Sequence, residues 1–179
     1  MGFAKVFIEP MQDRDIEEVM VIEHLSFPTA WPSNAFQTEI HQNQLAHYVS
    51  ARLISEEGMV LPPVVGYAGV WVIIDEVHVT TIAVHPEQRG KRIGEQLLYY
   101  LLNYGISKNA RWATLEVRES SKDVQSLYKK YGFSIVGVRK NYYAEEGENA
   151  VIMWAGNLQG DLFQERINQL AGKFMEATC

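Results

Sequence analysis

A short segment of the chain, HPEQRGKRIG at residues 85–94, gathers three cationic side chains around two glycines. Arg89, Lys91 and Arg92 lie within four residues, although the whole chain carries a formal net charge of −6. The segment follows an apolar run and precedes a helical pattern, a position where free N–H groups and the helix dipole favour phosphate. Glycine also lets the main chain approach a ligand closely. The pattern therefore favours an anion site, with a solvated basic turn as the alternative, because short glycine-rich patterns are weak signals.

The composition of this 179-residue chain argues against several classes of protein. The longest apolar run, residues 64–74, is too short to span a bilayer, and the N-terminus lacks a secretory-signal pattern. We therefore expect no membrane association and a cytoplasmic location. The single cysteine permits no internal disulfide, and the five histidines lack ligand spacing, so we expect no metal. Net acidity argues against nucleic-acid binding, and the absence of GxxxxGKS/T and GxGxxG argues against nucleotide folds.

Hydrophobic periodicity predicts the elements that must position this segment. We expect strands over residues 4–11, 46–55, 64–74, 76–84, 112–119, 133–140 and 150–154. We expect helices from Asp13, over 33–41, from 93 to about 105, from a Ser120–Asp123 capping box to Gly132, and along the C-terminal tail. Strands outnumber helices and crossovers are few, which predicts an α/β fold of the α+β type, with a central mixed sheet flanked by helices.

The C-terminal segment carries its own helical pattern. Four apolar residues recur there at helical spacing: Phe163, Ile167, Leu170 and Phe174. We therefore divide the chain into one domain over residues 1–156 and an amphipathic helical tail over residues 157–179. The apolar face of the tail is expected to pack on its own domain, with a partner surface as the alternative.

The segment TIAVHPEQRGKRIGEQLL resembles the acetyl-CoA-binding signature Q/R-x-x-G-x-G/A of the GCN5-related N-acetyltransferase (GNAT) superfamily. The residues that match its extended form are Gln88, Arg89, Gly90, Lys91, Ile93 and Gly94. Arg92 stands where the middle glycine usually lies, so we expect its side chain to point outward. The resemblance implies a single GNAT-like domain, acetyl-CoA as co-substrate, and a loop that binds the pyrophosphate of coenzyme A.

Further segments, within about residues 4–155, resemble the bacterial ribosomal-protein alanine acetyltransferases of the RimI type: SFPTAWPSNAF, DEVHVTTIAV, LEVRESSKDVQSLYKKYGF and RKNYYAEEGENAVIMW. This resemblance implies transfer of an acetyl group to the N-terminal alanine of a small-subunit ribosomal protein. Two alternatives stay open. One is a small-molecule amine acetyltransferase of the same fold, and the other is a non-catalytic acyl-CoA-binding module that regulates a partner.

The resemblance also implies contacts with the coenzyme. The backbone of Ile82, Ala83 and Val84 would bind the pantetheine arm and the thioester oxygen, because the family's strand splays from its neighbour there. Ser121 stands where the family usually has an asparagine, and its position places it at the cofactor site.

Glu116 is the candidate proton acceptor. It shares a strand face with Trp112 and Thr114. Burying a carboxylate there costs free energy unless the group has a catalytic role or an ion-pair partner. From the residues alone, a salt bridge to Arg118 or Arg139 is the alternative. The resemblance implies that Glu116 helps to deprotonate the acceptor amine.

Tyr128 is the candidate proton donor. By spacing alone it belongs to an apolar helix face with Val124, Leu127 and Tyr131, and this pattern favours a core aromatic residue. The resemblance implies instead that Tyr128 protonates the departing thiolate of coenzyme A, while Tyr131 packs beside the terminating Gly132.

The acceptor side is expected to hold five residues: Glu23, Tyr142, Tyr143, Glu145 and Glu146. Glu23 falls on the apolar side of the first helix. It would line the acceptor site or, as the alternative, merely mark the end of that helix. The two tyrosines would flank the peptide or serve as ordinary hairpin aromatics. The acidic run, which continues to Glu148, would attract a basic N-terminal peptide of a ribosomal protein or remain a solvated hairpin tip.

Overall fold

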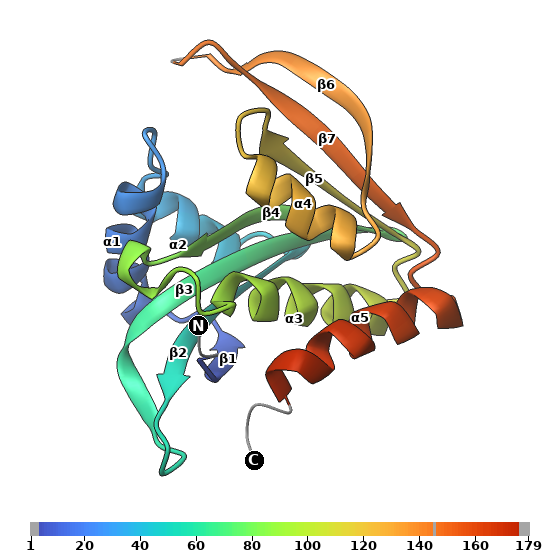
Figure 1. Cartoon of the computed structure of the whole chain (residues 1–179). Coiled ribbons are helices and arrows are strands. Elements are labelled where there is room, and N and C mark those ends of the chain that lie inside the picture. Colours follow the sequence, from blue (N-terminus) through green and yellow to red (C-terminus); the bar gives the residue numbers. More distant parts are fainter. Residues whose placement is uncertain (1–3, 145, 176–179) are drawn as a thin grey trace.

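The computed structural model describes residues 4–144 and 146–175 (Figure 1). The elements follow in the order β1 (Val6–Pro10), α1 (Ile16–Ser26), α2 (Ser33–His41), β2 (Ala46–Ile54), β3 (Val60–Ile73), β4 (Glu76–Val84), α3 (Ile93–Ser107), β5 (Trp112–Arg118), α4 (Lys122–Lys130), β6 (Ser134–Tyr143), β7 (Glu148–Gly156) and α5 (Asp161–Met175). Short 3-10 turns, η1 (Asp13–Asp15) and η2 (Pro86–Gln88), precede α1 and α3. The predicted order of strands and helices is confirmed.

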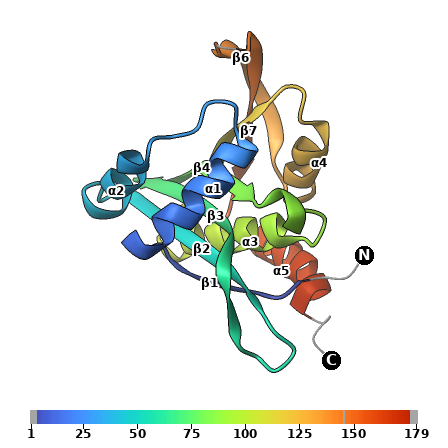
Figure 2. The ribbon, with the colours of Figure 1, turned by 90° about the vertical axis from the view of Figure 1, so that its left-hand side faces the viewer.

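The described strands form one seven-stranded sheet in the order β1-β2-β3-β4-β5-β7-β6. Strands β4 and β5 run parallel, and the other neighbouring pairs run antiparallel. Helices α1 and α2 pack on one face of the sheet and α3, α4 and α5 on the other, so that two hydrophobic cores form (Figure 1, Figure 2). This mixed sheet between helices confirms the predicted fold class.

The sheet opens between its two parallel strands. Strand β4 pairs with β5 from Glu76 opposite Trp112 to Val79 opposite Leu115, and the pairing stops there. Beyond that point β4 continues beside β3 to Val84, while β5 continues beside β7. In Figure 1, β5, β7 and β6 accordingly rise away from β4. The splay inferred from the family resemblance is therefore present in this chain.

A bulge in β4 marks the start of this opening. Gly69 of β3 pairs with Thr81 and Val70 pairs with Val79, which leaves Thr80 as an extra residue between them. A bulge bends its strand and re-aims the neighbouring side chains. Both Thr80 and Thr81 consequently line the cleft described below, although strict alternation would send one of them to the other face.

Several predicted boundaries need correction. Strand β3 starts four residues earlier than predicted, and β6 and β7 extend into the loop predicted at 141–149. The predicted capping box is wrong, because α4 has Ser121 as its N-cap and no side-chain cap. The reason is that the amide of Ser120 donates to Glu148 Oε1 of β7 at 2.9 Å, which holds this residue outside the helix. Val124, predicted on the apolar face of α4, is 41% exposed.

The C-terminal helix packs on its own protein. The four apolar residues predicted for it are buried, and three of them, Phe163, Ile167 and Leu170, belong to the larger core. Phe174 meets the ring of Tyr99 edge-on, with centroids 5.8 Å apart. The division of the chain at residue 156 stays a prediction, because the apolar side of α5 shares the core of the preceding domain.

Candidate active site

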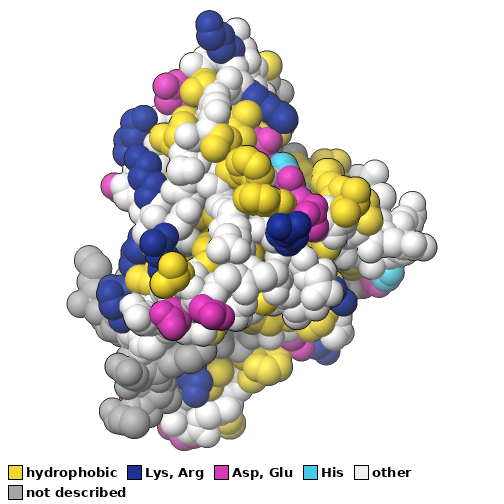
Figure 3. Space-filling model, turned by 90° about the vertical axis from the view of Figure 1, so that its right-hand side faces the viewer, with side chains coloured by type: hydrophobic (Ala, Val, Ile, Leu, Met, Phe, Trp, Pro, Cys, Tyr) yellow, Lys and Arg dark blue, Asp and Glu magenta, His cyan; other side chains and the backbone are white. Residues whose placement is uncertain are grey.

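A cleft of about 730 Å³ opens where β4 and β5 part. Its walls come from α1 and the loop after it, from β3, β4 and β5, and from the tip of the β6–β7 hairpin. The residues predicted for the acceptor side that line it are Glu23, Tyr142, Tyr143 and Glu146, and Glu116 joins them. Glu145 lies outside the described residues. On the face shown in Figure 3, acidic, basic and hydrophobic side chains lie beside a histidine in a hollow between two lobes.

Glu116 lies at the wall formed by β5, and its side chain is 11% exposed. Its Oε2 is 3.0 Å from His78 Nε2, and its Oε1 is 3.4 Å from Arg139 Nη1. The hydrogen bond with His78 lowers the pKa of Glu116, against the opposing effect of burial, and the positive charge of Arg139 lowers it further. Of the two ion pairs considered from the sequence, Arg139 is a partner and Arg118 is not, because Arg118 points to the hairpin.

Sequence reasoning missed His78. This residue lies on β4, directly opposite Thr114 of β5 in the parallel register, so its imidazole shares the cleft with Glu116. The available signal was the period-two alternation of EVHVTT, which places His78 on the face opposite the buried Val77 and Val79. That alternation does not reveal which strand lies beside β4, because the partner is more than thirty residues away in sequence.

Glu23 is a buried carboxylate at the far side of the cleft. It is 3% exposed on α1, and burial raises its pKa. Its Oε1 accepts the amide of Trp31 at 2.9 Å, and its Oε2 accepts the hydroxyl of Tyr67. The bond from Trp31 opposes the effect of burial on the pKa. Glu23 therefore does more than end a helix, since it fixes the loop after α1 at the cleft wall.

The hairpin tip brings two aromatic rings over the cleft. Tyr142 and Tyr143 meet edge-on, with centroids 5.1 Å apart, and the guanidinium of Arg118 lies 3.9 Å from the ring centre of Tyr143. The same guanidinium bonds Glu146 and, at 2.9 Å, Glu148. Hydrogen bonds from Ser120, and then from Arg118, lower the pKa of Glu148 to about 2. Glu146 and Glu148, the described glutamates of the acidic run expected from the sequence, are thus ion-paired in the structure.

The backbone of the basic loop takes a left-handed turn before α3. Gly90 has φ of +79°, a region that favours glycine. The first hydrogen bond at the start of α3 runs from the amide of Gln96 to the carbonyl of Arg92 at 3.1 Å. The amides of Ile93 to Glu95 precede this bond, so they are the donors that a helix start leaves without a helical acceptor. The N-terminus of α3 therefore presents N–H groups for a bound anion.

The cationic side chains of this loop are held by the protein. Arg89 donates through Nε to the carbonyl of Val84 at 3.2 Å and through Nη2 to Ser26 at 3.1 Å. Lys91 donates to Gln88 Oε1 at 2.6 Å. These bonds fix the loop against the end of β4 and the end of α1 before any ligand arrives.

Arg92 explains why the signature usually has a glycine at its position. Its backbone is left-handed, with φ of 60° and ψ of 21°, a conformation that glycine adopts at lower cost than arginine. Its Nη1 lies 3.4 Å from Glu95 Oε2 on the first turn of α3. The side chain is partly exposed, as expected for one that points outward, but its guanidinium turns back towards the first turn of the helix.

The end of β4 connects this loop with the cleft. Ile82, Ala83 and Val84 lie beyond the last pair with β5, so one edge of their backbone has no strand partner among the described residues. A side chain placed on Gly94 would lie 3.6 Å from Val84, which shows how closely α3 approaches this strand. Ser121 stands across the opening at the N-cap of α4, and its hydroxyl makes no cap bond.

Tyr128 lies within α4 and Tyr131 is its C-cap residue, and their surroundings differ. Tyr131 is fully buried, and its hydroxyl donates to Glu95 Oε1 at 3.1 Å. Tyr128 is 8% exposed, and its hydroxyl has no hydrogen-bond partner among the described residues. Burial, reinforced by the neighbouring Tyr143, raises the pKa of Tyr128, so this phenol stays protonated at neutral pH. Of these two tyrosines, Tyr128 is therefore the one whose hydroxyl has no partner within the described protein.

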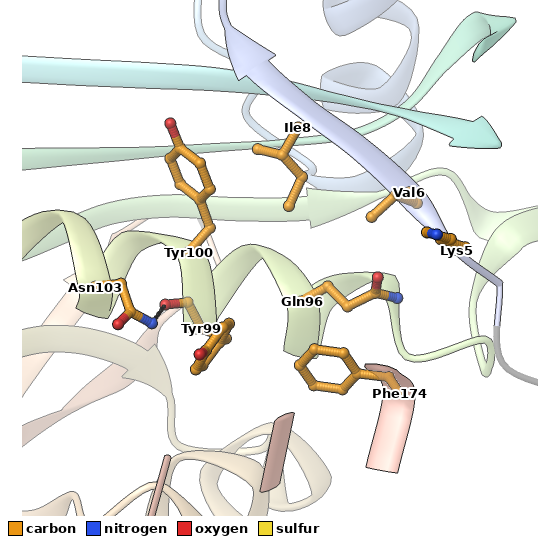
Figure 4. Close-up of a pocket in the computed structure, with 8 residues that line it drawn as sticks. All are labelled: Lys5, Val6, Ile8, Gln96, Tyr99, Tyr100, Asn103 and Phe174. Atoms are coloured by element: carbon orange, nitrogen blue, oxygen red, sulfur yellow. Dashed lines mark hydrogen bonds between the residues drawn. The ribbon is translucent and has the colours of Figure 1, made fainter. Parts of the chain in front are cut away.

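A second hollow, of about 510 Å³, lies apart from this site, between β1, α3 and α5 (Figure 4). Tyr99, Tyr100 and Phe174 form much of its wall, and Lys5 lies at its rim. None of the described residues lining it is acidic or a histidine, and it shares no residue with the cleft. Of these two hollows, only the β4–β5 cleft is lined by described carboxylate and imidazole side chains.

Residues 4–144 and 146–175 show neither a metal-binding cluster nor a membrane-spanning helix. No cluster of three or more histidine, cysteine, aspartate or glutamate residues there could hold a metal ion. No helix in this part of the chain is long and apolar enough to cross a membrane.

The chain is similar to known acetyltransferases over most of its length. It is 39% identical over 151 residues to the putative ribosomal protein bS18-alanine N-acetyltransferase of Bacillus subtilis, covering 84% of this chain and 95% of that protein. It is 32% identical to the ribosomal protein bS18-alanine N-acetyltransferase of Haemophilus influenzae, covering 82% and 95% of the two chains. The crystal structure of the corresponding Escherichia coli enzyme has the same fold, with a TM-score of 0.74 at 24% identity over 86% of this chain and 94% of that one.

The family model described as the acetyltransferase (GNAT) family matches residues 16–133. This range runs from α1 to the end of α4 and includes both the loop before α3 and the opening between β4 and β5. With the agreement in fold and the identity to its relatives, this match establishes that the chain belongs to the GNAT family of N-acetyltransferases.

Proposed function

We propose that this protein transfers the acetyl group of acetyl-CoA to the α-amino group of the N-terminal alanine of a small-subunit ribosomal protein. The observation that carries the proposal is the opening between β4 and β5, which joins an anion-binding helix start to a cleft holding Glu116 and His78. The names of the relatives from Bacillus and Haemophilus support the choice of acceptor. Such an acceptor is made in the cytoplasm, which is the location that we propose.

The residues present fit coenzyme A. The positive φ of Gly90 and the free amides at the start of α3 suit a pyrophosphate, and Arg89 and Lys91 add positive charge beside it. The edge of Ile82 to Val84, which has no strand partner among the described residues, suits an amide-bearing arm such as pantetheine. Acetyl-CoA supplies the acetyl group as a thioester, and the same strand edge offers N–H groups to the thioester oxygen.

The acceptor amine needs only modest help to lose its proton. An α-amino group has a pKa of about 8, so roughly a quarter is neutral near pH 7.5, whereas for a lysine amine the fraction is on the order of one in a thousand. We assign Glu116 to hold the ammonium form in the cleft and, with His78, to take up its proton. The lowered pKa of Glu116 keeps the carboxylate charged for this task.

Tyr128 is assigned to protonate the departing thiolate. Its hydroxyl keeps its proton at neutral pH, because burial raises its pKa. The hydroxyl also has no hydrogen-bond partner among the described residues, and a buried phenol without a partner is suited to a ligand atom that reaches it. The engagement of Tyr131 with Glu95 supports Tyr128 as the donor.

Glu23, Tyr142, Tyr143 and Glu146 are assigned to the acceptor peptide. The tyrosine rings would flank the first residues of the chain, and the carboxylates would favour a free amino terminus followed by arginine or lysine. Because Arg118 balances the charge at the hairpin tip, the preference for basic peptides rests mainly on Glu23 and Glu116 inside the cleft.

The test is mass spectrometry of synthetic peptides that begin with the N-termini of small-subunit ribosomal proteins, incubated with acetyl-CoA. We expect acetylation of the alanine peptide and none of the same peptide with a blocked α-amine. Spermidine and an aminoglycoside serve as small-amine controls. Faster acetylation of either small amine would favour the small-molecule acetyltransferase, and acetyl-CoA binding without acetylation of any amine would favour a regulatory module.

A further inference from the structure

Glu95 is a buried carboxylate on the first turn of α3, 6% exposed, and its bonds lead to another helix. Its Oε1 accepts the ammonium of Lys130 at 2.6 Å and the hydroxyl of Tyr131 at 3.1 Å, both from the end of α4. Its Oε2 lies 3.4 Å from Arg92 Nη1. A glutamate at the third position of a helix commonly folds back to the amide of the N-cap residue. Helix α3 has no side-chain cap, and the carboxylate of Glu95 is turned to α4 instead.

Helix α4, which carries Tyr128, is tied to the rest of the protein at both ends. Near its start, the buried Gln125 donates from Nε2 to two carbonyl oxygens at the end of β5, at 3.0 and 3.1 Å. At its other end, Glu95 accepts the two bonds described above. Tyr128 lies three residues after Gln125 and three before Tyr131, on the same side of the helix. The two ties therefore hold the turn of α4 that presents Tyr128.

The bonds from Glu95 to α4 connect the two halves of the opened sheet. Helix α3 follows β4 and helix α4 follows β5, and these strands are no longer paired beyond Val79 and Leu115. In Figure 1, α4 lies with the strands that rise away from β4. Strand pairing therefore does not set the distance between the start of α3 and Tyr128, and contacts between the two helices must do so. The bond between Glu95 and Lys130 is a charge-assisted contact of this kind.

We propose that Glu95 is a positioning residue that holds α4, and with it the hydroxyl of Tyr128, at a fixed distance from the anion site at the start of α3. This inference rests on the proposed function for the role of Tyr128. The same carboxylate stands on the helix turn whose free amides suit the pyrophosphate, so its charge opposes a bound anion. Lys130 offsets that charge and, with Tyr131, keeps the carboxylate turned away from the amides.

The first test is calorimetry of the full chain with coenzyme A, which needs no turnover. Glu95→Gln keeps the shape and removes the negative charge, so the affinity should rise roughly two- to tenfold, more at low salt than at high. Lys130→Met breaks the same ion pair from its other side and leaves the carboxylate charged, so the affinity should fall by a similar factor. Lys129→Met, at the exposed next residue of α4, is the matched control and should bind nearly as the wild type does. A fall in affinity in both variants of the pair would overturn the proposal, because loss of structure weakens binding from either side.

The second test follows kcat with an alanine peptide and saturating acetyl-CoA, where chemistry limits turnover. Glu95→Gln and Lys130→Met should each lower kcat roughly tenfold, because a loosened α4 misplaces the hydroxyl of Tyr128. In the Tyr128→Phe background neither substitution should lower kcat further, since the hydroxyl through which it acts is absent. Lys130 is partly exposed, so its variant keeps the test available should Glu95→Gln unfold. A loss of equal size with and without the hydroxyl would overturn the positioning role, because general damage to the site acts in both backgrounds.

The two tests separate this inference from the function on which it rests. If the protein acetylates no peptide while the two variants shift the affinity for coenzyme A in opposite directions, the proposed function fails and the charge relation between Glu95 and Lys130 stands. If the peptide is acetylated but the loss in kcat does not depend on the hydroxyl of Tyr128, the positioning role of Glu95 fails and the function stands.

Discussion

Replacing Glu116 by glutamine tests how the acceptor amine loses its proton. Glutamine has nearly the same shape and keeps one oxygen acceptor, but it removes the negative charge that faces His78 at 3.0 Å and Arg139 at 3.4 Å. Because the hydrogen bond with His78 holds the pKa of Glu116 below its ordinary value, the wild-type carboxylate stays charged from pH 6.5 to 9. Any pH dependence of the variant's defect in this range therefore comes from other groups, the amine above all.

The expected loss in kcat/KM follows from the fraction of the acceptor amine that is neutral at each pH. With a pKa of about 8, roughly 90% of an α-amine is neutral at pH 9 and roughly 3% at pH 6.5, a difference of about thirtyfold. If Glu116 captures the ammonium form and helps to deprotonate it, the loss in kcat/KM should grow by up to about that factor between the two pH values. At pH 6.5 we expect a loss on the order of 10²-fold, or about 2.7 kcal/mol of transition-state stabilisation.

The assay is the initial rate of acetylation of an alanine peptide, measured by mass spectrometry under conditions where chemistry limits turnover. Calorimetry with acetyl-CoA should give the wild-type affinity, and Glu165→Gln, an exposed glutamate of α5, is the matched control. A loss of equal size at pH 6.5 and pH 9 would refute the capture of the ammonium form. Wild-type turnover at both would make Glu116 a structural residue.

The same variant has a predicted stability profile. A carboxyl group whose pKa is lowered by folding stabilises the protein above its unfolded pKa, and this contribution disappears as the pH falls through the folded value. The wild type should therefore be more stable than Glu116→Gln at neutral pH, and their Tm values should converge as the pH falls below the ordinary glutamate value of 4.5. Thermal unfolding at several pH values measures this difference.

Three further variants test other parts of the account. Tyr128→Phe should lower kcat roughly 10²-fold with acetyl-CoA affinity nearly intact, since it deletes only the hydroxyl, and unchanged kcat in a chemistry-limited assay would exclude this residue as the acid. Gly90→Pro should weaken acetyl-CoA binding, because proline cannot adopt the φ of +79°, and unchanged affinity in a folded variant would place the anion elsewhere. Reversing the charges of Glu146 and Glu148 should raise KM for basic peptides only modestly, because Arg118 already offsets these charges, and more at low salt than at high, with acetyl-CoA binding unchanged. Insensitivity of KM to salt and to these reversals would leave the two residues a structural role.

Much of the fold follows from local patterns. The β-branched run at residues 76–84 and the helical stripe after it predict β4 and α3 because alternation and helical spacing act over a few residues. The start of α4 was misplaced for the opposite reason, since Glu148 of a later strand binds the amide of Ser120. Contacts between distant segments override a local capping signal.

The candidate site likewise contains residues that local motifs predict and residues that depend on contacts between distant strands. Gly90 was predicted for the site from a contiguous motif, and its φ of +79° is a backbone conformation that favours glycine. His78 was not identified, because its role depends on lying opposite Thr114 and near Glu116, and single-sequence alternation does not give the register of a parallel strand pair. Likewise, the pairing of Arg118 with the acidic hairpin depends on β5 and β7 being neighbours in the sheet.

The most direct test of the central claim is a competition between acceptors in one reaction. An alanine-terminated peptide from a small-subunit ribosomal protein is mixed with its α-blocked counterpart, which keeps the same lysines, and with spermidine, and tandem mass spectrometry locates the acetyl group. Our account predicts acetylation of the α-amine of alanine at a rate far above that of any lysine or of spermidine. Acetylation mainly on lysine side chains or on spermidine would contradict it.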